Sequence, residues 1–377
     1  MKLRKGMSAG RYHSGCGVPG LVRAAAFLPL LLSSQLNAHP ASFAERAAEL
    51  GLEHVEDVPL SGGVSRFDYQ SIDEGRRRLY ISHLGADLVT VVDMDSGKVV
   101  ADIRDIPRPH GILAVPGLGR VYVSATGRDQ LYVIDENSLK VTAKIPAGRY
   151  PDGIAFVPEL KRLFVSDETG GTVAVIDAPG EKLLKKIAIG GEVGNTHYDP
   201  VSGLVYSTNQ TNDVLVAIDP RKMKVLGRYK LSGCAGAHGF YIDAPSRYAF
   251  VTGEDNASYV VFDLEKKEII ARGRTGASPD VLAFDGGSRR LYVASESGVA
   301  SLFILQSGKV RKAGEAFFAP HAHTVSVDRE TRRVFFPLEN VDGRPVLRIM
   351  KEVRRDDARP RKEKPGESRA LSSPAGN

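Results

Sequence analysis

The sequence predicts an all-β fold, a β-propeller of seven four-stranded blades. A strand motif with a central aromatic residue recurs seven times, at spacings of 42 to 44 residues. Each copy holds four short strand-like runs separated by turn residues, and no helical period persists between them. Four strands per repeat match one propeller blade, whereas the repeats of a β-solenoid, the alternative, are usually shorter. The aromatic residues that mark the copies are Tyr80, Tyr122, Phe164, Tyr206, Phe250, Tyr292 and Phe335.

The first 38 residues are typical of an export signal. They carry five basic and no acidic residues, and the apolar run 24–32 follows the last basic residue, Arg23. Cleavage after Ala38 or Ala44 fits the small-residue rule, so we expect a periplasmic or secreted protein. The alternative is that this run is a buried helix of the fold. No apolar run reaches the roughly 18 residues that cross a bilayer, so we expect no transmembrane segment in the mature chain.

The remaining elements follow in order. Residues 39–52 are expected to form a short helix and linker outside the propeller, which spans residues 53–351. The last copy ends after its third strand, Val346–Met350, so the spare run Glu53–Pro59 is expected to supply the fourth strand of blade seven. That pairing closes the ring and removes two exposed sheet edges. The charged, Pro-rich tail 352–377 is expected to be disordered.

The chain has 51 basic and 45 acidic residues, a formal charge of +6, but the excess lies outside the propeller. The first 38 residues contribute five positive charges and the tail from Lys351 a net three, so the residues between them carry about −2. A strongly basic nucleic-acid surface is therefore not predicted. We expect a monomer that binds a small-molecule ligand or a protein partner.

The repeat resembles the YVTN-repeat, YncE-like family of exported seven-bladed propellers over about residues 53–351. The aromatic strand motif carries the resemblance, together with Pro-x-Gly before the first strand and a recurring third-strand Asp. This Asp is expected to accept hydrogen bonds from the following turn. Propellers that look similar include lactonases, a metal-dependent lyase and copper or iron oxidoreductases, so the resemblance leaves the activity open. The Asp positions are Asp93, Asp135, Asp177, Asp219 and Asp263.

One repeat position is expected to form a ring at the mouth of the central channel. In a propeller, the loop leading into the innermost strand and the loop between strands two and three lie on one face, the funnel face. The position twelve residues before each aromatic marker gives Asp68, His110, Asp152, Gly194, His238, Asp280 and His323. Asn195 could substitute where Gly194 breaks the pattern, and His197 lies nearby. Arg66, Arg108 and Arg149 are on the inward loops, and Glu168, Glu254, Glu296 and Glu339 on the two–three loops.

These residue types allow three interpretations. His110, His197, His238 and His323 are candidate ligands of a divalent or copper metal ion, because imidazole suits these ions. His110, His238 or His323 could instead act as a general base in a lactonase-type hydrolase, with an arginine stabilising an anion. In the third interpretation the ring only ties neighbouring blades together. Cys234, close to His238, is either a soft ligand, a nucleophile or a small buried residue.

The leading hypothesis is a propeller that binds a ligand or protein partner at the funnel face. The alternatives are a hydrolase, metal-assisted lyase or oxidoreductase at the same ring, and a structural surface-repeat protein. No phosphate-binding glycine loop, serine nucleophile elbow or paired Cys-x-x-Cys motif occurs in the sequence.

Overall fold

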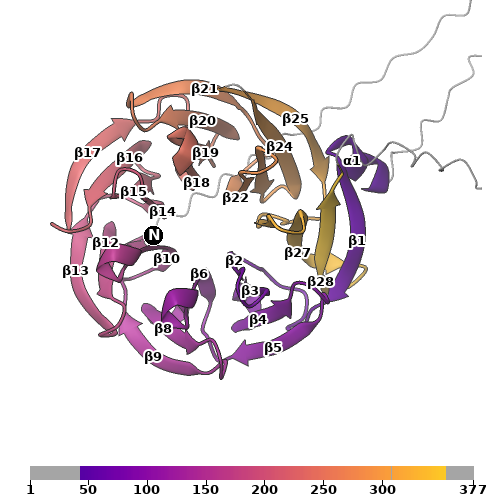
Figure 1. Ribbon diagram of the computed structural model, residues 1–377, viewed down its shortest axis with the longest axis horizontal. Helices are drawn as coiled ribbons and strands as arrows, with labels where there is room; N and C mark the ends of the chain where they lie inside the picture. The colour runs from indigo at the N-terminus through magenta and orange to yellow at the C-terminus, as the bar shows by residue number, and fades with distance from the viewer. Residues whose placement is uncertain (1–42, 307, 354–377) are drawn as a thin grey trace, which may run out of the picture. The chain divides into compact units, whose positions relative to one another are not determined.

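A computed structural model describes residues 43–306 and 308–353. These residues belong to one compact unit and contain one α-helix and 28 strands, arranged as seven four-stranded sheets. The sheets form the blades of a propeller around a central channel (Figure 1). The expected signal segment with its cleavage site after Ala38 and the expected tail from residue 354 lie outside the described residues. The alternative cleavage site, after Ala44, lies within the described helix at residues 43–49.

Every blade is an antiparallel sheet, and in blades one to six the strands run outward in chain order, with the first strand innermost. Blade one contains β2 (Gln70–Asp73), β3 (Arg78–His83), β4 (Leu88–Asp93) and β5 (Val99–Arg104). Blade two contains β6 (Pro109–Val115), β7 (Arg120–Ala125), β8 (Gln130–Asp135) and β9 (Val141–Pro146). Blade three contains β10 (Pro151–Val157), β11 (Arg162–Asp167), β12 (Thr172–Asp177) and β13 (Lys182–Ala188). Blade four contains β14 (Val193–Asp199), β15 (Leu204–Asn209), β16 (Val214–Asp219) and β17 (Lys224–Lys230). Blade five contains β18 (Ala237–Asp243), β19 (Tyr248–Gly253), β20 (Ser258–Asp263) and β21 (Glu268–Arg274). Blade six contains β22 (Pro279–Asp285), β23 (Arg290–Ser295), β24 (Val299–Gln306) and β25 (Lys309–Phe317).

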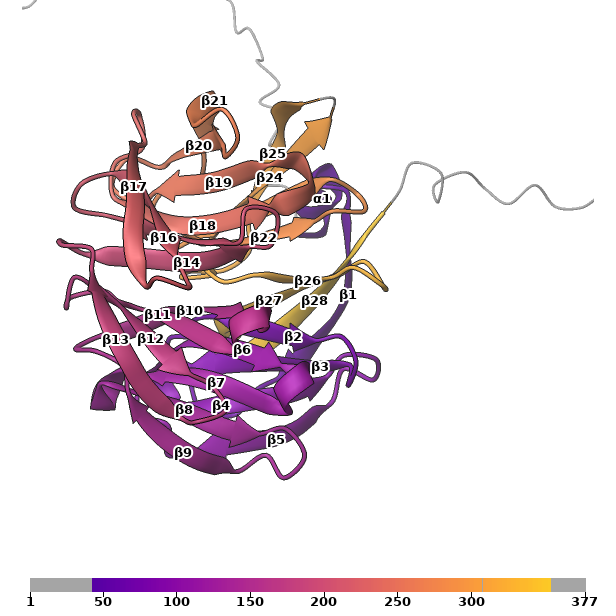
Figure 2. The same cartoon turned by 60° about the vertical axis from the view of Figure 1, so that its left-hand side comes forward.

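The N-terminal strand closes the ring, as expected from the sequence. Blade seven contains β26 (Ser326–Asp328), β27 (Arg333–Val341), β28 (Arg344–Glu352) and β1 (Leu52–Pro59). The outer strand β1 pairs antiparallel with β28, from Leu52 opposite Glu352 to Pro59 opposite Val346. Two contacts of 2.8 and 2.6 Å between the Arg348 guanidinium and the Asp57 carboxylate fasten this pair. The short helix α1 (Phe43–Glu49) lies beside β1 and β25, outside the ring (Figure 2).

The repeated aromatic residue forms the core between blades. All seven markers of the sequence repeat are at most 1% exposed. Each lies on the second strand of its blade, where a side chain on either face of the sheet meets a neighbouring blade. Tyr122, for example, packs with Leu163 and Val165 of the next blade. The sheets are therefore buried on both faces, which explains the nearly continuous apolar runs of the middle strands.

Two recurrent polar contacts fix the turns and the blades. The third-strand Asp accepts backbone N–H bonds from the turn that follows, as expected, at Asp93, Asp135, Asp219 and Asp263. Ion pairs also join consecutive blades, for which the sequence analysis gave no expectation. Asp199 pairs with Arg247 at 2.8 Å and Asp243 with Arg289 at 2.8 Å. Both arginines lie in turns with positive φ, of 61° and 58°.

Candidate functional site

The innermost strands of five blades carry the same irregularity at the ring position. In β6, Pro109 pairs with Ala125 and the next pair is Ile112 with Val123, so one extra residue is inserted on the inner strand. The same shift occurs in β10, β14, β18 and β22. Such a bulge interrupts the ladder and redirects side chains, and bulges are common beside functional sites. It lies at His110 and at its equivalents in the other four blades.

The glycine of the Pro-x-Gly motif lets neighbouring bulges approach each other. A Cβ atom on Gly111 would lie 2.0 Å from the carbonyl oxygen of Asp152 in the next blade. On Gly239, which holds the same repeat position but follows Ala237 instead of a proline, it would lie 1.9 Å from the carbonyl oxygen of Asp280. No real Cβ fits at these distances, so glycine is needed at these two positions for the close contact between inner strands. The motif therefore has a structural cause, and it draws the ring residues together.

The ring surrounds a cavity of about 140 Å³. Six carboxyl groups line it, three from the ring itself and three from the two–three loops, against one arginine and two histidines. Asp152 and Asp280 are 2% and 7% exposed, so these carboxyl groups are almost completely removed from bulk water. The lining side chains are Arg66, Asp68, Tyr69, His110, Tyr150, Asp152, Glu168, His238, Glu254, Asp280 and Glu296.

Two of the six carboxyl groups have close cationic partners. Nε2 of His238 lies 3.2 Å from Oδ1 of Asp280. Burial opposes charging of this imidazole, but the hydrogen bond and charge of Asp280, with the charges of Asp152 and Glu254, raise its pKa to about 10. Burial likewise opposes ionisation of Asp280, and His238 outweighs it, holding its pKa at about 2. Nη1 of Arg66 lies 2.5 Å from Oε1 of Glu296. The pair of His238 and Asp280 is therefore charged at neutral pH.

The other four carboxyl groups are those whose pKa is raised. Burial and the charges of Asp280 and Asp152 hold the pKa of Asp68 well above its usual range, although Arg66 lies 4.0 Å away. Burial also raises the pKa of Asp152, to about 7. Glu168 and Glu254 show raised pKa values for the same first reason, burial. The cavity thus holds more acidic groups than its own cations balance.

His110 is the neutral histidine of the cavity. Its Nδ1–H donates to the carbonyl oxygen of Arg108 at 3.1 Å, so Nε2 carries the lone pair. Nε2 accepts a hydrogen bond of 2.9 Å from the Tyr150 hydroxyl. Burial, with the charges of Arg108 and Arg66, lowers its pKa to about 4. His110 and His238 therefore differ in charge although they occupy the same repeat position.

His323 lies directly behind the cavity wall. Its side chain is 0% exposed, and its Nδ1–H donates to the carbonyl oxygen of His321 at 2.9 Å. Nε2 has no hydrogen-bond partner and lies 3.9 Å from Oδ2 of Asp280. Burial lowers the pKa of this imidazole. Within the described ranges, Asp280, Glu296 and His323 are a group whose ligand atoms lie within 4.8 Å of one another, close enough to share a metal ion.

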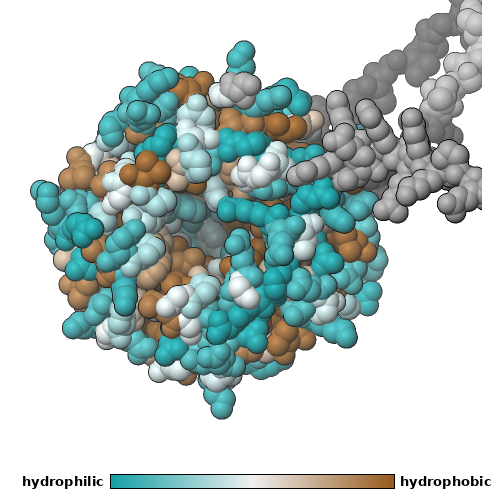
Figure 3. All heavy atoms as spheres, viewed as in Figure 1, coloured by the Kyte–Doolittle hydropathy of each residue, from teal (hydrophilic) through white to brown (hydrophobic). Residues whose placement is uncertain are grey.

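Some expected site residues lie elsewhere. His197 does not join the other three histidines: it stacks edge-on against Phe240 at 5.0 Å and lines a second cavity of about 400 Å³ further along the channel. Asn195 accepts a hydrogen bond from the Tyr69 hydroxyl, and Tyr69 lines both cavities. The pattern misplaced His197 because it lies two residues beyond the bulge. In the space-filling view the surface is hollowed near the centre of the ring (Figure 3).

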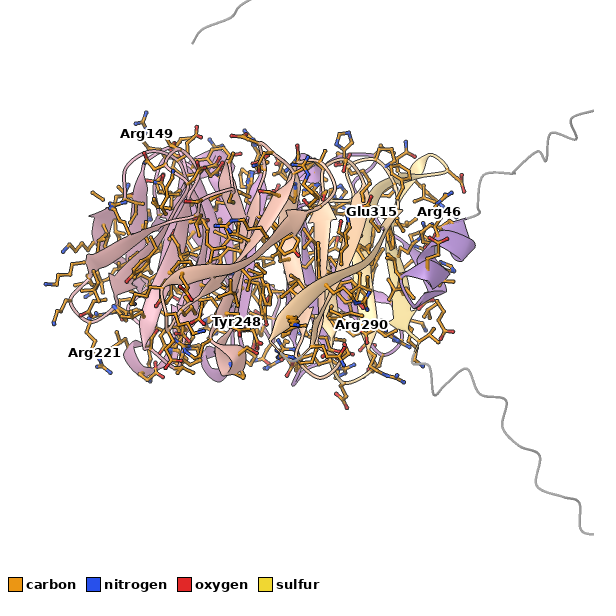
Figure 4. All side chains as sticks on the ribbon, turned by 90° about the horizontal axis from the view of Figure 1, so that it is seen from above. Arg46, Arg149, Arg221, Tyr248, Arg290 and Glu315 are labelled. Carbon is orange, nitrogen blue, oxygen red and sulfur yellow. The ribbon has the colours of Figure 1, made fainter. Side chains whose placement is uncertain are left out.

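The remaining arginines of the inward loops lie at the surface. Arg149 extends from the funnel face into solvent, on the side opposite Arg221 and Tyr248 (Figure 4). Arg108 is exposed, with its guanidinium carbon 5.9 Å from the centre of the Tyr150 ring. Of the three expected arginines, only Arg66 lines the cavity.

Cys234 is a buried core residue in the structure. Its side chain packs in the apolar cluster between blades four and five and is 3% exposed. Burial raises the pKa of the thiol to about 12, so it is protonated at neutral pH. Of the three interpretations, the structure fits the small buried residue.

The repeat pattern did not predict three residues that line or support the cavity: Tyr69, Tyr150 and Gln210. The amide of Gln210 lies 2.8 Å from Nδ1 of His238. A signal for Gln210 was present, since it lies four residues after its aromatic marker. The same offset gives Glu168, Glu254, Glu296 and Glu339. For the two tyrosines no repeat pattern exists, because each occurs in a single blade.

Comparisons with known proteins agree with the fold. No family model matches the chain, and no curated protein matches it. Among solved structures, the chain is similar to hydrazine synthase from Kuenenia stuttgartiensis, with a TM-score of 0.65 and 14% sequence identity. The match covers 78% of this chain and 96% of that one. At this identity the likeness concerns the propeller fold alone. In the described part of the chain no helix is long and apolar enough to cross a membrane.

Proposed function

We propose that this protein is an exported, monomeric propeller of the YVTN-repeat type that binds a positively charged organic group in its acidic cavity. The repeat motifs and the signal-like first 38 residues support the family and the export. The observation that supports binding is that the cavity is lined by more carboxyl groups than cationic groups. Asp152, Glu168 and Glu254 line it without a close cationic partner, and Asp68 has only Arg66 at 4.0 Å; all four have raised pKa values.

A bound cation would relieve this imbalance. Like charges held together in a buried site cannot all ionise, and an added positive charge allows them to do so. An amine or guanidinium group also supplies several hydrogen-bond donors to carboxylates. The cavity of about 140 Å³ equals roughly four to five water volumes, which suits such a group but not a large molecule.

Calorimetric titration of the purified protein with methylguanidine and butylamine tests this proposal. Methylurea, which has nearly the shape of methylguanidine but no charge, is the matched control ligand. We expect saturable binding of at least one cation and none of methylurea. Asp152→Asn should weaken binding at least about tenfold, since hydrogen bonds to charged groups contribute about 1.5–3 kcal/mol. Equal binding of the charged and neutral probes would overturn the proposal.

A further inference from the structure

We propose that Asp280, Glu296 and His323 form a binding site for one divalent transition-metal ion, Zn²⁺ or Mn²⁺, which Arg66 closes in the absence of metal. This inference deepens the proposed function, since it places a metal ion in one corner of the same cation-binding cavity. Two carboxylates and one imidazole are ligands that both ions accept, and three protein ligands leave positions for water or a ligand.

The orientation of His323 carries the inference. Its Nδ1–H is held by the carbonyl oxygen of His321 at 2.9 Å, which fixes the tautomer and leaves the lone pair on Nε2. Metal-binding histidines almost always donate their other ring N–H to a carbonyl or carboxylate in this way. Nε2 is fully buried, has no hydrogen-bond partner and lies 3.9 Å from Oδ2 of Asp280. A buried acceptor without a donor costs free energy, which a ligand on that atom would recover.

The carboxylates of the site are held in place as well. Oδ1 of Asp280 lies 3.2 Å from Nε2 of His238, so this histidine orients Asp280 and leaves Oδ2 towards His323. Such contacts behind the ligands are typical of metal sites. Glu296 is the more accessible member, with a side chain 23% exposed, and it is positioned by the loop between β23 and β24. Its Oε2 lies 3.5 Å from Nδ1 of His323, so this carboxylate has to turn to reach a metal ion bound at Nε2, whereas the other two ligands are fixed.

The guanidinium of Arg66 lies where the proposed metal ion would bring its positive charge. This guanidinium contacts Glu296 at 2.5 Å and lies 3.9 Å from Oδ2 of Asp280. These are the same two carboxylates that a metal ion would use. The Arg66 side chain is 39% exposed and belongs to the loop before β2, so it can turn out towards solvent. A metal ion and the Arg66 guanidinium therefore compete, because both would bring positive charge to the same oxygens.

Because Arg66 competes with the metal ion, substitutions of His323 and of Arg66 should change the affinity for Zn²⁺ in opposite directions. Chelator-treated full-length protein is titrated with ZnCl₂ by calorimetry, and Co²⁺ absorption serves as a second readout of nitrogen and oxygen coordination. We expect one Zn²⁺ per chain. His323→Gln should weaken Zn²⁺ binding by about tenfold or more, as loss of a supporting contact alone does. Arg66→Gln should tighten it by about tenfold, and His54→Gln, on the outer strand β1, should leave it unchanged.

Three results would overturn the inference: no Zn²⁺ binding, equal binding by wild type and His323→Gln, or weaker binding by Arg66→Gln. If His323→Gln does not fold, the more exposed Glu296→Gln replaces it with the same expectation. Binding of methylguanidine without binding of Zn²⁺ would contradict the metal site alone. If the wild-type protein bound neither methylguanidine nor Zn²⁺, the proposed function would be contradicted as well.

Discussion

At the scale of single residues, equal positions in the repeat acquire unequal charges. His110 and His238 both lie twelve residues before the aromatic marker of their blade, yet the pKa of His110 is about 4 and that of His238 about 10. The cause is the neighbouring blade. Burial opposes charging of both imidazoles, but His238 lies 3.2 Å from the ionised Asp280 of the next blade, whereas for His110 the charges of Arg108 and Arg66 act in the same direction as burial. Chemistry at this site therefore depends on pairs across blades and not on the repeat itself.

Asp152 gives the most direct residue-scale prediction for stability. Its pKa is about 7 in the folded protein, against 3.8 for the free group. The folded state therefore holds a proton that the unfolded chain has lost, so its stability falls as the pH rises from about 4 to about 7. Asp152→Asn removes this titration. At pH 8 the variant should be more stable than wild type by about 1–3 kcal/mol, and at pH 4 nearly equal to it.

Urea denaturation at pH 4 and pH 8 measures this difference. Asp342→Asn is a matched control, because Asp342 is exposed in the β27–β28 turn. It should not change the pH dependence. A loss of stability in Asp152→Asn at pH 8 would contradict the account, since it would mean that the charged carboxylate stabilises the fold. A gain would mark Asp152 as a residue whose charge costs stability, as is common at functional sites.

At the scale of elements, the bulge in the innermost strands decides which residues enter the cavity. The repeat predicted the blade number, the strand order and the closing strand, because these follow from spacing and alternation alone. It also predicted most of the ring by simple counting. It could not predict the extra residue in five of the inner strands. For this reason Asn195 and His197 were grouped with the ring, although one contacts Tyr69 and the other lines the second cavity.

The glycine that follows the ring residue in three of the bulged strands, Gly111, Gly153 and Gly239, yields an element-scale prediction. Gly239→Ala places a Cβ atom 1.9 Å from the carbonyl oxygen of Asp280, a backbone atom that cannot turn away. The two inner strands must separate, which should destabilise the protein by about 1–3 kcal/mol. It should also weaken binding of methylguanidine, because Asp280 and His238 move apart. Gly286→Ala, where a Cβ meets nothing within 4 Å, is the matched control.

Thermal unfolding and the titration above measure both effects. The expected result is a lower melting temperature and weaker binding for Gly239→Ala only. If Gly239→Ala and Gly286→Ala behaved alike, the contact between blades five and six would not hold the ring together as described.

At the scale of the whole molecule, ring closure concentrates charge. Seven loops converge on one mouth, and β1 completes the circle by pairing with β28. Ion pairs such as Asp199 with Arg247 join consecutive blades and keep the ring rigid. The cavity therefore cannot expand to relieve repulsion among its carboxylates, and protons neutralise them instead. The sequence indicated acidic residues on this face, but their protonation depends on burial, which only the assembled ring creates.

The central claim is that the cavity exchanges protons for a cation. Titration with methylguanidine at pH 7, in two buffers of different ionisation enthalpy, counts the protons released on binding. Because the pKa of Asp152 is about 7, about half a proton or more should leave for each cation bound. Affinity should accordingly rise between pH 6 and pH 8. Binding without proton release, or binding that weakens as the pH rises, would contradict the claim.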